Sequence, residues 1–96
     1  MYSIKESSIH GKGIIADKNI LKHRMVGIVI YSKYFFFNFR TRDLGFYLNH
    51  SFNNNCRLIY KNNMYYLITT KNILKNDELT INYDDTPWFI VGSWLL

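Results

Sequence analysis

Short segments rich in β-branched and aromatic residues recur along the chain, and turn-forming residues separate them. This alternation constrains the fold most, because such segments are typical of strands rather than helices. The predicted strands are residues 2–5, 13–17, 25–31, 34–39, 57–60 and 64–69. Lys61-Asn62-Asn63 predicts a hairpin turn between the last two, since Asn accepts a positive φ. Residues 40–48 could hold a helical turn or two, so the sequence predicts a mostly β domain with little helix.

The size of the chain favours a single domain. Its 96 residues are enough for one domain with a small core. No linker, repeat or low-complexity stretch marks a boundary, so we expect one domain over residues 1–96. Apolar residues make up 48% of the chain and aromatic residues 18%, which excludes a disordered chain.

The cysteine content and the lack of long apolar runs bear on metal sites, disulfides and membrane segments. Cys56 is the single Cys, which excludes an internal disulfide and a zinc site built from several cysteines. The N-terminal MYSIKESS lacks the apolar core of a secretory signal. No apolar run approaches the ~18 residues of a membrane span. We therefore expect an intracellular protein without a metal and without a membrane segment.

The charge of the chain bears on its partners. The formal net charge is +5, which would suit an acidic partner such as nucleic acid. The basic residues are scattered, however, and form no dense run. A solvated surface explains them better, so we do not expect nucleic acid as a direct ligand.

Residues 8–16 contain the first stretch that could carry chemistry, His10-Gly11-Lys12-Gly13. Two glycines one residue apart make a turn in which φ is free and no Cβ blocks a ligand. Such a loop can offer backbone N–H groups to a carboxylate or a phosphate. Taken alone, an ordinary hairpin turn is the better interpretation.

Residues 49–56, NHSFNNNC, form the second stretch. They follow an apolar run, so Asn49 and His50 should be at least partly buried, and a buried amide must be hydrogen-bonded. Asn49 could bridge backbone segments or bind a ligand. His50 could be a metal ligand only together with His10 and His23. These histidines do not have a recognisable metal-ligand spacing, so no metal site is expected. Taken alone, a structural turn is favoured here too.

The third stretch, residues 71–85, has a polar turn at Asn76-Asp77 that leads into a strand ending at Tyr83. A tyrosine at a strand end is usually an amphipathic residue at the rim of the core. None of the three stretches identifies a function by itself.

Together, in this order, the three stretches resemble the SET domain of protein-lysine methyltransferases. The matching segments are SIHGKGIIADKNI (8–20), YLNHSFNNNC (47–56) and LITTKNILKNDELTINYDD (67–85). The pairing of N-H-S-x-x-x-N-C with E-L-T-x-x-Y is highly specific for that family. The compact length resembles the minimal stand-alone SET proteins of large DNA viruses.

The resemblance implies a fold and a cofactor. The fold would be that of the SET domain, with a C-terminal pseudoknot, which is a known exception to the rule that chains avoid threading. The cofactor would be S-adenosylmethionine, which Asn49 and His50 would contact while Asn55 holds the turn. The glycine turn would add Lys12 and Gly13 to the cofactor site.

The resemblance also implies roles in catalysis and substrate binding. Tyr83 matches the near-invariant catalytic tyrosine. Tyr47 is a candidate wall of the lysine channel, as are Phe46, Tyr31 and Tyr34, although plain core packing would explain each of these. Asp84, with Asp85, is a plausible docking acid for a basic histone tail. Trp88, in the aromatic segment 86–96, could cover the adenine or form a dimer interface.

Departures from the family pattern leave other functions open. Asn54 occupies the usual position of a proline, and Leu58 occupies the position where some members carry a second active-site tyrosine. The leading hypothesis is a methyltransferase acting on a histone tail or another lysine-bearing protein, in the host nucleus if the protein is viral. The alternatives are a catalytically weak SET-like module that binds cofactor or peptide, and a small basic nucleic-acid binder. A homodimer is possible because the tail is apolar.

Overall fold

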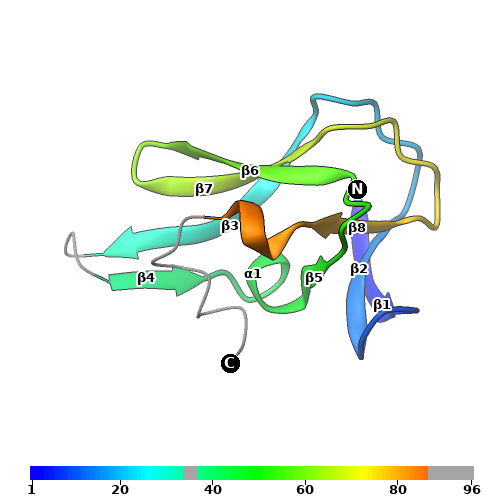
Figure 1. Ribbon diagram of the computed structural model, residues 1–96, viewed down its shortest axis with the longest axis horizontal. Coiled ribbons are helices and arrows are strands. Elements are labelled where there is room, and N and C mark those ends of the chain that lie inside the picture. Colours follow the sequence, from blue (N-terminus) through cyan, green and yellow to red (C-terminus); the bar gives the residue numbers. More distant parts are fainter. Residues whose placement is uncertain (34–36, 87–96) are drawn as a thin grey trace.

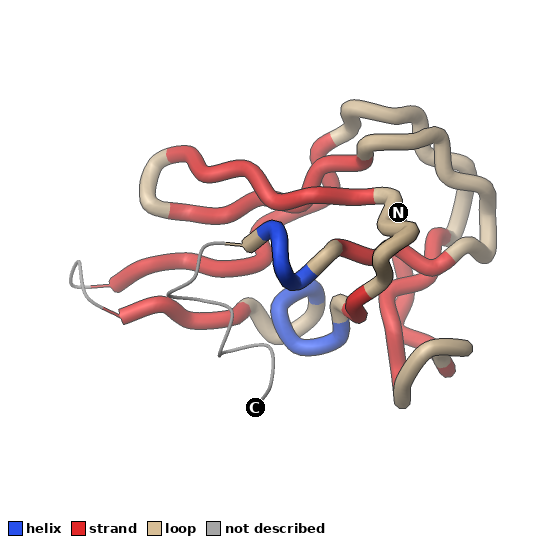
Figure 2. Tube along the Cα trace, viewed as in Figure 1, coloured by secondary structure: helices blue, strands red, loops and turns tan. Residues whose placement is uncertain are grey.

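Two small sheets make up the computed structural model, which describes residues 1–33 and 37–86 (Figure 1). The first sheet contains, in spatial order, β1 (Tyr2–Glu6), β2 (Lys12–Ala16), β8 (Glu78–Ile81) and β5 (Asn49–His50). The second contains β4 (Phe37–Arg40), β3 (Met25–Lys33), β7 (Met64–Thr69) and β6 (Cys56–Lys61). Within these described residues, helix is limited to α1 (Leu44–Tyr47) and the 3₁₀ turn η1 (Tyr83–Asp85), drawn in blue in Figure 2. The prediction of a mostly β fold with little helix is confirmed.

The hairpin of β6 and β7 forms where the sequence predicts it. Asn62 and Asn63 adopt φ values of 51° and 64°, the left-handed pair that a tight hairpin turn requires. Burial alternates along β7, whose Tyr65, Leu67 and Thr69 face inward. This alternation is the period of two that a strand covered on one face should have.

An apolar core of the described residues lies between the two sheets and α1. Its fully buried members come from β2, β3, α1, β6, β7 and β8 and from the connecting segments that carry Leu48 and Ile73. They include Ile14, Ile30, Leu44, Leu67 and Leu79. Burying such side chains is the main source of stability for a domain of this size.

The segment after β5 holds β8 in place from the side opposite β2. β5 pairs with β8 in parallel, at Asn49↔Thr80 and His50↔Ile81. Beyond it, the Asn55 amide donates to the Glu78 carbonyl at 2.8 Å and accepts from the Thr80 N–H at 2.9 Å. The Asn55 side chain thus makes two hydrogen bonds to β8 that a neighbouring strand would otherwise make with its backbone. β8 therefore lies between β2 and the asparagine-rich segment.

No helix within the described parts of the chain is long and apolar enough to cross a membrane.

Candidate functional site

Three segments that are distant in sequence meet at one end of the first sheet. β2 runs antiparallel to β8, with Ile14 opposite Leu79, and β5 runs parallel to β8. The start of β2 therefore lies at the same end as the C-terminal ends of β5 and β8. The register alone brings the predicted site residues to this end: Lys12, Gly13, Asn49, His50 and Tyr83.

Asn49 connects the glycine turn to this end of the sheet. Its side chain is buried, and Nδ2 lies 3.1 Å from Ser7 Oγ, 3.1 Å from the His10 carbonyl and 3.3 Å from the Lys12 carbonyl. Nδ2 also lies 2.9 Å from Glu78 Oε2. Two protons are shared among these four acceptors. Asn49 could either bridge segments of the chain or bind a ligand. Its amide nitrogen bridges segments. Its Oδ1 makes no hydrogen bond within residues 1–33 and 37–86 and remains available to a ligand.

Glu78 is the residue of this site that sequence reasoning missed. Its Oε1 accepts from Ser7 Oγ at 2.7 Å and its Oε2 from Asn49. A Cβ built at Gly13 would lie 2.8 Å from the Glu78 Cδ atom. The space at Gly13 is therefore filled by this carboxylate and is not open to a ligand, whereas Gly11, with φ of 48°, has nothing within 4 Å of a Cβ. Glu78 begins the E-L-T-x-x-Y motif of residues 78–83, but no role was assigned to it from the sequence.

His50 and Tyr83 pack against each other. The Tyr83 N–H donates to His50 Nδ1 at 2.9 Å, and the ring centroids lie 5.1 Å apart. Because Nδ1 accepts, the imidazole carries its proton on Nε2. Phe52, largely exposed, also contacts the His50 ring edge-on, with centroids 4.5 Å apart. His50 thus positions the backbone that carries Tyr83.

The Tyr83 hydroxyl points at the backbone immediately before Asn49. It donates to the Leu48 carbonyl at 2.6 Å, so two oxygen atoms come together at this point. Burial raises the pKa of Tyr83 above its usual value; Arg40 opposes this shift and Glu78 adds to it. The hydroxyl therefore stays protonated at physiological pH and keeps its hydrogen bond.

The remaining predicted residues lie in varied surroundings. Lys12 and Asp84 are exposed, and the Asp84 N–H is bound by Asn82 Oδ1 at 2.9 Å. Tyr47 is half-buried and packs against the core. Trp88, with the rest of the aromatic segment from Pro87 onward, lies outside the described residues.

The other candidate channel walls lie in surroundings that differ from one to the next. Phe46 is 52% exposed, with the Arg40 guanidinium 5.0 Å from its ring, so it is neither a core residue nor an enclosed wall. Tyr31 stacks on Phe39 with centroids 5.6 Å apart, in the β3–β4 hairpin. Tyr34 lies outside the described residues.

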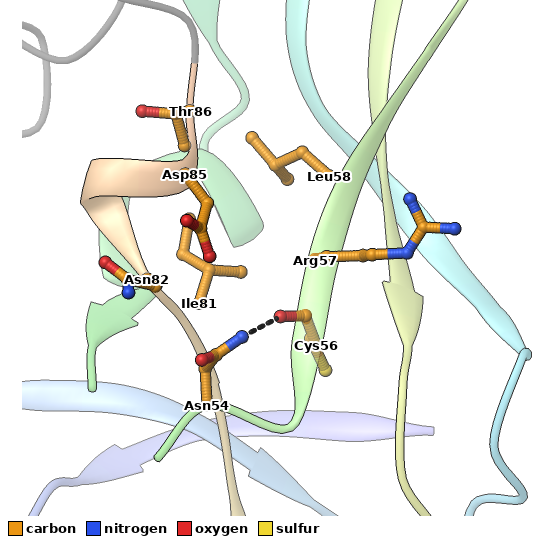
Figure 3. Close-up of a pocket in the computed structure, with 8 residues that line it drawn as sticks. All are labelled: Asn54, Cys56, Arg57, Leu58, Ile81, Asn82, Asp85 and Thr86. Carbon is orange, nitrogen blue, oxygen red and sulfur yellow. Dashed lines mark hydrogen bonds between the residues drawn. The ribbon is translucent and has the colours of Figure 1, made fainter. Parts of the chain in front are cut away.

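A pocket of about 290 Å³ opens beside η1, between β6 and the chain that leaves β8 (Figure 3). It is lined by Asn54, Cys56, Arg57, Leu58, Ile81, Asn82, Asp85 and Thr86. Leu58 points into it, while the Arg57 guanidinium points away from the Asp85 carboxylate (Figure 3). Its lining comes from two distant segments, which is why no single motif in the sequence indicated the pocket as a whole.

Among the described residues, no group of three or more His, Cys, Asp or Glu side chains could hold a metal ion.

Comparison with known proteins relates this arrangement to one family model, that of the SET domain, which matches residues 33–84. A Plasmodium falciparum protein provisionally assigned as a histone methyltransferase has a similar structure, with a TM-score of 0.68 and 21% identity over 91% of this chain and 96% of that one. The SET domain of the RIZ1 tumour suppressor (PRDM2) gives a TM-score of 0.70 and 18% identity over 98% and 76%. No curated protein matches the chain by sequence. At these identities the two structures establish a shared fold.

Proposed function

The chain belongs to the SET-domain family, and we propose that it is a protein-lysine N-methyltransferase that uses S-adenosylmethionine. The observation that carries the proposal is the 2.6 Å contact between the Tyr83 hydroxyl and the Leu48 carbonyl, beside Asn49 and His50. Methyl transfer to an amine moves positive charge through the reacting centre. Two oxygens held at one point can stabilise that charge without rearrangement.

The donor set at this end of the sheet fits the amino-acid portion of the cofactor. A carboxylate can be held by the exposed Lys12 ammonium, and an ammonium by Asn49 Oδ1, which has no partner within the described residues. Gly11 leaves its side of the turn open, since nothing lies within 4 Å of a Cβ there. His50 would add contacts from the adjoining position, and Trp88 is proposed as a cover for the adenine. When bound, the cofactor supplies a methyl group activated by a sulfonium.

The protein must also provide a neutral lysine. An unperturbed lysine has a pKa of about 10.4, so only about one in a thousand is neutral near pH 7.5, a cost of about 4 kcal/mol. Apolar side chains lower that pKa because they desolvate the ammonium form. Leu58 and Ile81 line the pocket next to Tyr83 and could supply such surroundings. The neutral Tyr83 hydroxyl would then orient the amine rather than act as a strong base.

A histone tail is the proposed substrate, or another protein segment with several basic residues. Asp84 is exposed and Asp85 lines the pocket, so two carboxylates flank the reacting tyrosine. Two acids at this site favour a cationic segment although the whole chain has a formal net charge of +5. The likeness to a Plasmodium falciparum protein assigned to histone methylation supports the same choice. A chromatin substrate would place the protein in a nucleus.

Methyl transfer from radiolabelled S-adenosylmethionine to a panel of purified core histones tests the proposal. We expect label on one histone, together with a cofactor-dependent rise in the melting temperature of the protein. The absence of both would contradict the proposal. A rise in melting temperature without label on histones or on a lysine-rich peptide library would instead identify a cofactor-binding module without turnover.

A further inference from the structure

The same five residues, Lys-Asn-Ile-Leu-Lys, occur at positions 18–22 and 71–75. This short repeat lies inside the domain and marks no boundary. The fold places the two copies side by side, in the paired loops at the upper right of Figure 1. Ile20 and Ile73 exchange both backbone hydrogen bonds, each at 2.8 Å.

Equivalent residues of the two copies play equivalent roles. Asn19 Oδ1 accepts from the Lys75 N–H at 2.8 Å, and Asn72 Oδ1 accepts from the Lys22 N–H at 2.9 Å. Each asparagine thus bonds the other copy, as an approximate two-fold arrangement requires. The isoleucines are buried in both copies, whereas Leu21 and Leu74 are 70% and 63% exposed.

The two loops also concentrate positive charge. Five of the chain's twelve Lys and Arg residues lie within residues 17–24 and 70–77, but only two of its seven acids do. Both acids are engaged locally: Asp17 accepts from Ser3 Oγ at 2.6 Å, and Asp77 accepts from the Leu74 N–H at 3.1 Å. We call this surface the KNILK face; its members are Lys18, Leu21, Lys22, Arg24, Lys71, Leu74 and Lys75.

The cations of the KNILK face are largely without partners. Lys71 Nζ donates to Asn53 Oδ1 at 3.1 Å. The other four form no ion pair with a carboxylate in residues 1–33 or 37–86. A hollow of about 180 Å³ adjoins Leu21, lined by Met1, Lys18, Asn19, Ile20, Leu21 and Arg24. Its lining therefore combines three apolar side chains, of Met1, Ile20 and Leu21, with the two cations Lys18 and Arg24.

This surface lies at the other end of the first sheet from the candidate site. One loop follows the end of β2, and the other precedes the start of β8. The Ala16 N–H donates to the Asp77 carbonyl at 2.9 Å where the two loops meet these strands. Lys12 and Tyr83 lie at the opposite ends of these strands. The KNILK face is thus independent of the residues assigned to methyl transfer.

We propose that the KNILK face binds an acidic protein segment that carries at least one apolar side chain. Carboxylates would meet the unpaired lysines and Arg24, and the apolar side chain would enter the hollow beside Leu21. A second copy of this chain is disfavoured, because it would set lysines against lysines. A nucleic-acid backbone would use the cations but would leave two exposed leucines without a partner.

Fluorescence anisotropy with the purified protein can test this binding. The probe is a labelled synthetic peptide of Asp, Glu and Leu, and the comparison peptide has every Leu replaced by Ser. We expect Lys18→Glu/Lys75→Glu and Leu21→Ser/Leu74→Ser each to weaken binding of the Leu-containing peptide about tenfold or more. The matched control is Lys5→Glu/Lys61→Glu, which makes the same charge change at exposed positions elsewhere and should bind about threefold more weakly at most.

The proposal is overturned by equal binding of the two peptides, or by equal losses in the face variants and the control. Tighter binding of duplex DNA, or of phosphatidylserine vesicles, with the same variant losses would also overturn it in favour of that ligand. All substituted side chains are exposed, so unchanged melting temperatures and unchanged methyl transfer verify that the variants are folded.

Discussion

Asn49 connects three segments through one amide group. Its Nδ2 reaches the turn that follows β1, the start of β2, and Glu78 at the start of β8. A sequence pattern could indicate that this amide is buried and bonded. It could not identify the partners, because Ser7 and Glu78 are 71 residues apart in the chain. Sequence reasoning could therefore indicate Asn49 as a buried, bonded amide but not the network that it joins, which includes Glu78.

Asn49→Ala should destabilise the protein by about 1–3 kcal/mol, since it removes a partner of the half-buried Glu78 carboxylate and of Ser7. Urea unfolding measures this change. Asn53→Ala, at an exposed position, is the matched control and should change stability by about 0.5 kcal/mol or less. An equal loss in the two variants would contradict the role given to Asn49.

Gly13→Ala should cost about 1–3 kcal/mol, because the new Cβ displaces the Glu78 carboxylate from its two hydrogen bonds. Gly11→Ala meets no atom within 4 Å and should cost only the strain of its left-handed φ of 48°, about 1 kcal/mol. Urea unfolding in the wild-type and Glu78→Ala backgrounds separates the two causes. Gly13→Ala should cost less once Glu78 is removed, and an unchanged cost would contradict the explanation.

Among the elements, those with strong local signals were predictable and those defined by distant pairing were not. β6 and β7 follow from β-branched and aromatic residues around an asparagine turn. β5 is only Asn49–His50, two polar residues whose strand character comes from parallel pairing with β8. The 3₁₀ turn η1 was likewise missed. The Asn82 side chain caps this turn by accepting a hydrogen bond from the Asp84 N–H. That bond favours the turn over a continuation of the preceding strand.

Substitutions at Asn62 should change the stability of the β6–β7 hairpin only through how readily the new residue adopts a positive φ. With φ at 51°, Asn62→Ala should destabilise the hairpin by about 1 kcal/mol, whereas Asn62→Gly should be neutral or stabilising. Thermal unfolding of the two variants measures this difference. Equal melting temperatures would show that the turn conformation contributes little to stability.

At the scale of the whole molecule, stability should fall at alkaline pH. Burial raises the pKa of the Cys56 thiol from its ordinary value of 9.0 to about 12. It also raises the pKa values of Tyr2, Tyr65 and Tyr83 above 10.0. A raised pKa means that the folded chain binds protons more tightly than the unfolded chain. The resulting stability is fully present below about pH 9 and is lost as the pH rises toward 12.

Urea unfolding at neutral pH and at about pH 10.5 tests this dependence, with Cys56→Ala as the comparison. The wild type should lose more stability between the two pH values than the variant does. Iodoacetamide should modify Cys56 only under unfolding conditions, because its side chain has no exposed surface. Rapid modification of the folded protein would contradict the burial of this thiol.

The central claim is that Tyr83 acts in methyl transfer at the end of the sheet where Asn49 and His50 lie. Its most direct test measures both S-adenosylmethionine affinity and the methyl-transfer rate in the wild type and in Tyr83→Phe. Tyr60→Phe, which removes an exposed hydroxyl far along β6, is the matched control. We predict similar cofactor affinity in all three proteins and a rate lower by roughly 100-fold in Tyr83→Phe alone. An unchanged rate in Tyr83→Phe, with cofactor bound, would contradict the claim.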